Sequence, residues 1–322
     1  MQSPAAANII QFHVVQPATP LDRALSSFLS VKTAARKAPS TINDYRRFIS
    51  QFYRLYPAAW DNPATMRAAF MNWIAQPDIA DATYNLRLIY LRAFWHWCVE
   101  EEIQPPRPDP FRGIKRRRDA GKFRDIDAAR VKELLTLPDR KTWIGLRDYA
   151  LILFTLDTAT RPGEAVQLTP ADFDLTSFAV TIPAHVAKTR RQRIIPFSPS
   201  AAAALDDLQR RRPPQWKDTA PVFASVTGRR LCVDRWNDRL KRYRLHDGFT
   251  FKPYDLRHAA CTLHLRAGMN GETLQRLMGH STPTMTQRYI HLTNDDLKKA
   301  QALTSPVETL APRGKRAPRR IE

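Results

Sequence analysis

Apolar residues recur at helical spacing in the first third of the chain. Between residues 41 and 56 they stand three and four positions apart, which predicts an amphipathic helix. Thr41 and Asp44 form a capping-box pattern at its start. A second helix is predicted over residues 82–100, where apolar side chains repeat at the same spacing while Arg87 and Arg92 lie elsewhere on its surface. This part of the chain is therefore predicted to form a small helical bundle.

The second half of the chain mixes helical and alternating patterns. An apolar helix is predicted over residues 146–156, and two alternating stretches, 178–183 and 193–197, predict neighbouring strands. The polar turn between these strands places Lys188 at an exposed hairpin edge. Further helices are predicted over residues 199–211, 233–243, 253–266, 271–278 and 284–290. The expected fold class is mostly α with a small antiparallel β-sheet.

A proline-rich segment, residues 104–119, separates the two patterns. Its prolines cannot continue a helix, so the segment is interpreted as an interdomain linker. It contains four consecutive basic residues, Lys115, Arg116, Arg117 and Arg118. Such a run is either a solvated tether or a segment that follows DNA phosphates, and the sequence leaves both readings open.

Charge and cysteine usage narrow the class of partner. Lys plus Arg number 51 against 31 Asp plus Glu, a formal net charge of +20 that favours a polyanion. No apolar run approaches the roughly 18 residues of a membrane span, and no signal-peptide pattern opens the chain. Three scattered cysteines are too few for a disulfide framework or a C-x-x-C metal site, which suits a reducing compartment. An intracellular protein that binds nucleic acid is expected.

Five residues of the second half suit metal-free attack on a phosphodiester. Two guanidinium groups, an acid, an imidazole and a nucleophile are available from Arg161, Arg257, Lys188, His280 and Tyr289. A tyrosine becomes a nucleophile only where its neighbours stabilise phenolate, because the ordinary phenol pKa is about 10. Taken singly, each residue also has a structural explanation, such as a surface ion pair or a solvated turn.

The order and spacing of these residues resemble the tyrosine recombinase family, the phage-integrase-like site-specific recombinases. The matching motifs are Thr160-Arg161-Pro162-Gly163-Glu164, the hairpin motif that begins at Lys188, Asp255-Leu256-Arg257-His258, Leu277-Met278-Gly279-His280, and Tyr289-Ile290-His291. The resemblance implies a helical core-binding domain and an α+β tyrosine-recombinase catalytic domain. It divides the chain into a flexible N-terminal tail (1–19), the core-binding domain (20–112), a basic linker (113–124), the catalytic domain (125–304) and a basic C-terminal tail (305–322).

By the same resemblance, Tyr289 attacks the scissile phosphate, forms a 3′-phosphotyrosyl link and frees a 5′-hydroxyl. Arg161, Arg257 and His280 are implied to stabilise the transition state, and Lys188 to protonate the leaving oxygen. Glu164 is implied to orient the nearby cationic groups, and His291 to support the nucleophile. The covalent link keeps the phosphodiester energy, so neither a cofactor nor a metal is expected. This agrees with the absence of a Gly-rich phosphate loop or a metal-spaced His/Cys cluster in the sequence.

The second arginine motif departs from the family pattern at one position. Tyr254 stands three residues before Arg257, where the family usually has histidine. A neutral phenol can donate a hydrogen bond to a phosphoryl oxygen, but it is a poor proton acceptor near pH 7. His258 is an alternative helper, although adjacent helical positions point in different directions, which argues against it.

The expected partner is double-stranded DNA with paired inverted-repeat sites, bound by a homo-tetramer or by a tetramer with a related recombinase, and no membrane. Candidate DNA contacts are Arg87, Arg92, Lys115, Arg116, Arg117 and Arg118. The expected task is integration, excision or resolution of a mobile element in the cytoplasm of a prokaryote, at the nucleoid.

Two rival functions use the same residues differently. A type IB topoisomerase-like enzyme shares the Arg/Lys/Tyr chemistry, but the compact helical first domain and the Leu-Met-Gly-His signature favour recombination. A catalytically silent DNA-binding or architectural protein is the other alternative, with Tyr254 marking the start of decay. Covalent adduct formation on a nicked DNA substrate separates the silent protein from the enzymes.

Overall fold

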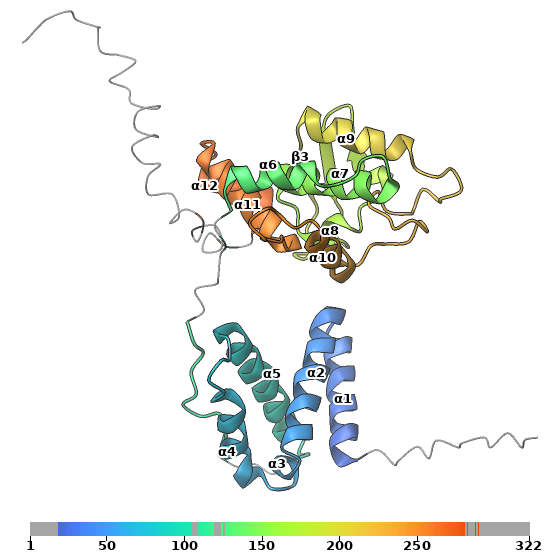
Figure 1. The fold of residues 1–322 in the computed structure, drawn as a ribbon. Coiled ribbons are helices and arrows are strands. Elements are labelled where there is room, and N and C mark those ends of the chain that lie inside the picture. Colours follow the sequence, from blue (N-terminus) through green and yellow to red (C-terminus); the bar gives the residue numbers. More distant parts are fainter. Residues whose placement is uncertain are drawn as a thin grey trace, which may run out of the picture. The chain divides into compact units, whose positions relative to one another are not determined.

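The computed structural model describes residues 19–104, 108–118, 124, 126–280, 282, 287 and 289 (Figure 1). The chain divides into two compact units, Met1–Lys122 and Phe123–Glu322, and each has its own apolar core. The fold is mostly helical, as predicted.

The described part of the first unit is a helical bundle. Its helices are α1 (Pro20–Ala34), α2 (Pro39–Leu55), α3 (Ala58–Asp61), α4 (Pro63–Ile74) and α5 (Asp81–Glu100). Figure 1 shows α1, α2 and α5 side by side, and each contacts the other two. The apolar stripe predicted for α2 is buried against them, with Ile49 and Phe52 fully inaccessible to solvent. Helical periodicity was therefore a sufficient guide to both predicted helices of this unit.

The predicted capping box at the start of α2 is wrong. The helix begins at Pro39, two residues before Thr41, and no side chain caps it. Proline at the first helical position has its φ already fixed and lacks the N–H group that a cap would satisfy, so the earlier start is favoured. Asp44 instead accepts hydrogen bonds from Arg47 at 2.9 Å and from the hydroxyl of Tyr90 at 3.4 Å.

The described part of the basic segment, residues 108–118, packs against the first unit. Phe111 is completely buried in its core. Arg92 donates to the carbonyl oxygens of Phe111 and Ile114 at 3.1 and 2.8 Å, and the hydroxyl of Tyr84 donates to the carbonyl of Lys115 at 3.2 Å. The four consecutive basic side chains are exposed while the backbone that carries them is anchored.

The second unit combines helices with a three-stranded sheet. The elements of its described part are α6 (Ala128–Thr136), α7 (Trp143–Thr158), α8 (Pro162–Ala165), η1 (Pro170–Asp172), β1 (Phe173–Asp174), β2 (Ala179–Ile182), β3 (Arg193–Pro196), α9 (Pro199–Arg210), α10 (Val233–Arg242), α11 (Pro253–Arg266) and α12 (Gly271–Met278). The sheet is antiparallel in the order β1-β2-β3, with Val180 opposite Ile195. Both predicted strands and the hairpin between them are confirmed. Of the helix predicted over residues 284–290, only residues 287 and 289 are described, and both are helical.

Helix α7 is the centre of the second unit. It lies between α9 and α11 and contacts both (Figure 1). Its apolar residues Leu151, Ile152 and Phe154 are at most 1% exposed, as expected for a helix covered on several sides. The helix ends at Thr158, and the positive φ of 50° at its C-cap residue Ala159 reverses the chain. This reversal brings the first arginine motif toward α11 and α12.

A buried charge cluster fixes α10 against α7. Asp148 of α7 is fully buried and accepts hydrogen bonds from Arg147 (2.6 Å), from Arg239 (2.9 Å) and from the hydroxyl of Tyr243 (2.7 Å). Burial and the nearby Asp148 carboxylate raise the pKa of Tyr243, so its hydroxyl remains a donor. Two cations and one phenol thus satisfy a single buried carboxylate.

Candidate active site

The first arginine is held at the start of a short helix. Arg161 is the N-cap residue of α8, and its side chain is only 12% exposed. One Nη atom lies 3.3 Å from Oε1 of Glu164, and the other donates to the carbonyl of Gly279 at 3.0 Å. A guanidinium with two fixed contacts is pre-oriented, so little conformational entropy is lost when it binds an anion.

Glu164 joins three segments through one buried carboxylate that is 2% exposed. Besides Arg161, it accepts the backbone N–H of Lys188 at 2.9 Å and the guanidinium of Arg193 at 2.5 Å. Burial by itself would raise the pKa of Glu164, but the Arg193 hydrogen bond and charge, the Lys188 N–H and Arg161 together hold that pKa below its ordinary value. The carboxylate is therefore ionised at neutral pH and ties the hairpin loop to the first arginine.

Sequence reasoning missed Arg193. It lies on β3 and is 12% exposed, and its Nε and Nη1 are buried without a hydrogen-bond partner among the described residues. A signal was available, because alternation along β3 places Arg193 on the same inward face as Ile195 while Ile194 is 66% exposed. A charge on the inward face of a strand needs a buried partner, here Glu164.

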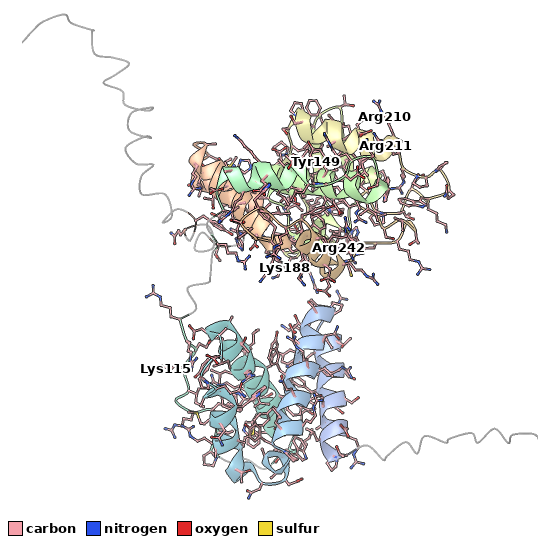
Figure 2. The ribbon with its side chains drawn as sticks, in the orientation of Figure 1. Lys115, Tyr149, Lys188, Arg210, Arg211 and Arg242 are labelled. Carbon is pink, nitrogen blue, oxygen red and sulfur yellow. The ribbon has the colours of Figure 1, made fainter. Side chains whose placement is uncertain are left out.

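Lys188 lies in the loop between β2 and β3, as predicted. Figure 2 labels it, and its side chain is exposed. Its backbone is anchored by the hydrogen bond to Glu164. The ammonium group is thus presented from a held loop rather than from a free turn.

The second arginine and His280 form a close pair. Arg257 of α11 is 4% exposed; it donates to the carbonyls of Ala159 and Met278, and its Nη2 lies 3.1 Å from Nε2 of His280. Gly279 ends α12 with a φ of 60°, a conformation that glycine adopts without strain, and the reversal turns His280 toward Arg257.

Charge and burial set the protonation of this pair. Burial and then Arg161 lower the pKa of Arg257 to about 10, so it remains a cation at neutral pH. Burial, Arg257 and Arg161 lower the pKa of His280 to about 4, so its imidazole is neutral. Because Nε2 accepts from Arg257, Nδ1 carries the proton and can donate to an anion.

Tyr289 is buried beside His258. The phenol is 4% exposed, and its oxygen lies 2.5 Å from Nδ1 of His258. Tyr254 is 49% exposed, and its ring centroid lies 6.5 Å from that of His258 on the same helix. Adjacent residues of α11 do point in different directions, as argued from the sequence. Both still reach the site, because Arg257 contacts His280 and His258 contacts Tyr289.

Several predicted contacts have other positions. The placement of Arg87 on the surface is wrong, because it is 9% exposed and donates to the carbonyl of Trp73 and to Gln76 at 3.1 Å. Arg92 is partly buried and anchors the segment after α5. The side chains of Lys115, Arg116, Arg117 and Arg118 are exposed, and Arg117 also lies over the ring of Tyr84. His291 lies outside the described residues.

A cationic cavity adjoins His280. Its volume is about 730 Å³, and it is lined by the hairpin loop, β3 and the end of α12, including Arg191, Arg193, Arg276 and His280. Within the described residues, no group of three or more His, Cys, Asp or Glu side chains is arranged to bind a metal ion. The site therefore offers donors for an anion.

Four separate segments thus meet in one site: the start of α8, the β2–β3 hairpin, α11, and the chain after α12. A sequence model for the phage integrase family matches residues 124–295, which is more than half of the chain. The chain belongs to the phage integrase family. The tyrosine-recombinase resemblance noted from the motifs is confirmed, and with it the assignment as an enzyme that cleaves and rejoins DNA strands.

Individual relatives agree with this assignment. The chain is 29% identical to tyrosine recombinase XerC of Pelotomaculum thermopropionicum over 246 residues, covering 74% of this chain and 79% of the relative. It is 26% identical to XerC of Yersinia pestis over 302 residues, covering 91% and 95%. Among solved structures, the Tn1549 transposon integrase in complex with circular intermediate DNA is similar in fold, with a TM-score of 0.67 at 19% identity, covering 88% of this chain and 99% of that one.

No helix in the described part of the chain is long and apolar enough to cross a membrane.

Proposed function

We propose that Tyr289 is the nucleophile of a site-specific recombination reaction on double-stranded DNA. The observation that carries this proposal is that Arg161, Arg257 and His280 converge at the end of α12. Arg161 donates to the carbonyl of Gly279, and Arg257 contacts the carbonyl of Met278 and the His280 ring. The phenol of Tyr289 is paired with the imidazole of His258 on the same helix as Arg257. Donors fixed in a partly buried site stabilise a developing phosphorane charge without reorganisation. A catalytically silent DNA-binding protein has no need for all these groups in one place.

The proposed reaction is a transesterification. The Tyr289 oxygen forms a bond to the scissile phosphorus, and the bond to the 5′ oxygen breaks, which leaves a 3′-phosphotyrosyl link. Lys188 gives its proton to the leaving 5′ oxygen, while Arg161, Arg257 and the Nδ1–H of His280 contact the non-bridging oxygens. Attack by a 5′-hydroxyl of another strand reverses these steps and needs no added energy source.

Three further residues support this chemistry in the proposal. Glu164 holds Arg161 and the backbone of Lys188 in register, through the contacts described above. Tyr254 is exposed at the same end of α11 and donates its hydroxyl to a phosphate oxygen. His291 supports the nucleophile, as the family resemblance implies.

The proposed substrate is a pair of inverted-repeat DNA sites held by four recombinase protomers, either identical or shared with a related recombinase. The net charge of +20 supports a polyanionic partner. The similarity to XerC proteins and to a transposon integrase supports integration, excision or resolution of a mobile element. The proposed location is the nucleoid in the cytoplasm of a prokaryote.

The exposed face of α2 is the proposed DNA contact of the first unit, instead of Arg87 and Arg92. A groove of about 700 Å³ runs along it, lined by Asn43, Arg46, Arg47, Ser50, Gln51 and Arg54. Arginines supply phosphate contacts, and amide and hydroxyl groups supply base contacts. The apolar face of the same helix is buried in the bundle, so this face is the one left for a ligand.

Replacing Arg46 and Arg54 together by alanine is expected to weaken DNA binding. The slope of log K against the logarithm of the salt concentration should become shallower by about 1–2, because each phosphate contact contributes roughly 0.9 to its magnitude. Binding is measured by fluorescence anisotropy of a labelled duplex at several salt concentrations.

The matched control is Arg210→Ala with Arg211→Ala at the C-terminal end of α9, which removes the same charge. Figure 2 shows these two residues on the side of the second unit opposite Lys188 and Arg242. If both double variants weaken binding equally, net charge and not the α2 face explains the effect.

The reaction is tested by trapping and mapping the covalent intermediate. Inverted repeats of roughly a dozen base pairs around a short spacer are sought in the DNA that flanks the gene, and a nicked suicide duplex is made from them. A covalent adduct whose DNA-linked peptide contains Tyr289, with a free 5′-hydroxyl on the released strand, is the expected result. Linkage to any other residue contradicts the assignment. Relaxation of a supercoiled plasmid that lacks the site would indicate a topoisomerase instead.

A further inference from the structure

We infer that His258 is the general base of the strand-cleavage step, accepting the phenolic proton of Tyr289 at Nδ1. This inference rests on the proposed function of Tyr289. The phenol oxygen and Nδ1 are 2.5 Å apart, which is the separation of a direct hydrogen bond and needs no bridging water. The two rings lie 5.7 Å apart between centroids, with their planes inclined at 34°.

Other groups near the phenol are poorly suited to take its proton. The Cys261 thiol also interacts with Tyr289, but burial raises its pKa to about 12, so it is a donor and not a base. Nε2 of His280 is occupied by the Arg257 guanidinium, and the low pKa of His280 makes it a weak acceptor. The exposed Tyr254 is a phenol and has no basic lone pair of comparable strength at neutral pH.

His258 has the right protonation state for this role. Burial and the charge of Arg257 lower its pKa below the ordinary value of 6.5, against the opposing effect of Asp255. The imidazole is therefore neutral at pH 7, and with the proton on Nε2 its Nδ1 accepts from Tyr289. The titratable and charged groups near His258 are Tyr254, Asp255 and Arg257 of its own helix, together with His280 and Tyr289 from the chain after α12.

Proton transfer belongs to the transition state and not to the resting pair. A free phenol has a pKa of about 10 against about 6.5 for imidazole, so the proton stays on oxygen before reaction. As the oxygen bonds to phosphorus its proton becomes acidic and passes to Nδ1, which gives an imidazolium ion near the Asp255 carboxylate. The same proton returns to the phenol when a 5′-hydroxyl displaces it, so the cycle is balanced.

The position of His258 also explains how a general base is supplied although Tyr254 stands three residues before Arg257, where the family usually has histidine. Tyr254 and His258 are four residues apart on α11, and their rings lie on the same face of that helix. One turn further along the helix, a histidine thus reaches the nucleophile directly. Tyr254 remains as a hydrogen-bond donor, and the base is supplied from the next turn.

His258→Asn is the first test, because an amide oxygen can take the place of Nδ1 and accept the hydrogen bond but cannot take the proton. Adduct formation on the nicked suicide duplex is expected to slow by about 10²–10⁴-fold, the range of general base catalysis. The wild-type rate should fall as the pH drops through the lowered pKa of His258. In His258→Asn that limb should disappear, and the rate should rise with pH toward the pKa of the phenol.

The matched control is His264→Gln on the same helix. Nε2 of His264 lies 2.9 Å from the carbonyl oxygen of Asp157, and a glutamine amide can replace that contact. This variant should cleave at the wild-type rate with the wild-type pH profile.

Two chemical substitutions distinguish a base from a structural residue. Fluorinated tyrosine at position 289 has a more acidic phenol and should restore much of the rate lost in His258→Asn. A 5′-bridging phosphorothiolate substrate needs no proton on its leaving group, so it should rescue Lys188→Ala but not His258→Asn. Both results support the inference, and rescue of His258→Asn by the phosphorothiolate would assign His258 to the leaving group instead.

His258→Asn that cleaves at the wild-type rate with an unchanged pH profile overturns the inference. If that variant does not fold, fluorotyrosine at position 289 of the otherwise unchanged chain gives the test. The pH at which the cleavage rate falls in acid should stay the same, because it reports on His258. A shift of that pH by as much as the pKa of the phenol changes overturns the inference. An adduct that persists in Tyr289→Phe instead refutes the proposed nucleophile, so the two failures are distinguishable.

Discussion

Tyr289→Phe is expected to abolish covalent adduct formation on the nicked suicide duplex while leaving DNA binding intact. The substitution removes one oxygen atom from a side chain that is 4% exposed and keeps the ring that packs in the small core of this region. Without that oxygen no phosphotyrosyl bond can form, and no described neighbour offers an equally nucleophilic group at the same place. The adduct is measured on a denaturing gel and binding by anisotropy.

Tyr243→Phe is the matched control for the loss of a buried phenol oxygen. Its hydroxyl donates to Asp148 at 2.7 Å, within the buried charge cluster that joins α10 to α7. This variant should be less stable, by roughly 1–3 kcal/mol for a hydrogen bond to a buried charge, yet it should form the adduct. An adduct that survives in Tyr289→Phe refutes the assignment of the nucleophile, and loss of DNA binding in it would indicate a structural role.

Glu164→Gln is expected to cause the largest loss of stability, about 3–5 kcal/mol, as when one partner of a buried ion pair is removed. Glutamine leaves the Arg161 and Arg193 guanidinium groups, each 12% exposed, without their shared carboxylate. The measurement is the free energy of unfolding from urea denaturation, followed by tryptophan fluorescence. Glu272→Gln on the exposed first turn of α12 is the control and should change stability little.

The stability difference should depend on pH with a definite sign. The pKa of Glu164 in the folded chain is below its ordinary value of 4.5. A carboxyl with a depressed folded pKa contributes stability that is fully present above the unfolded pKa and is lost as the pH falls through the folded pKa. The gap between wild type and Glu164→Gln should therefore be constant near neutral pH and should narrow below about pH 4.5. A gap that widens in acid contradicts this account.

Glu164→Gln should also slow cleavage, since the carboxylate holds the backbone of Lys188 and the guanidinium of Arg161. A 5′-bridging phosphorothiolate substrate separates these effects. On this substrate, Glu164→Gln should regain the part of the cleavage rate that is lost because Lys188 is misplaced. The loss of rate that remains is then due to Arg161. Recovery of the full wild-type rate would mean that Glu164 acts through the hairpin loop alone.

The regular elements of this chain were largely predictable because periodicity depends on local burial. Helices such as α2, α5 and α11 and both strands of the β2–β3 hairpin follow from the spacing of apolar residues, to within a few residues at each end. The predictions were wrong where another interaction was more favourable than the one that the local pattern indicated. The capping box lost to Pro39 at the helix start, and Arg87 was placed outside although its guanidinium is buried against Trp73.

The sequence by itself determined the family and the set of reactive groups, because motif order and residue types are properties of the chain alone. Only the tertiary structure decided which groups meet. It made Arg193 a partner of Glu164, it enclosed Arg257 between α7 and α12, and it placed the phenol of Tyr289 against His258. Such pairings depend on burial and on turns between distant segments. A pattern along one helix cannot contain them, since the partner of each residue lies on another element.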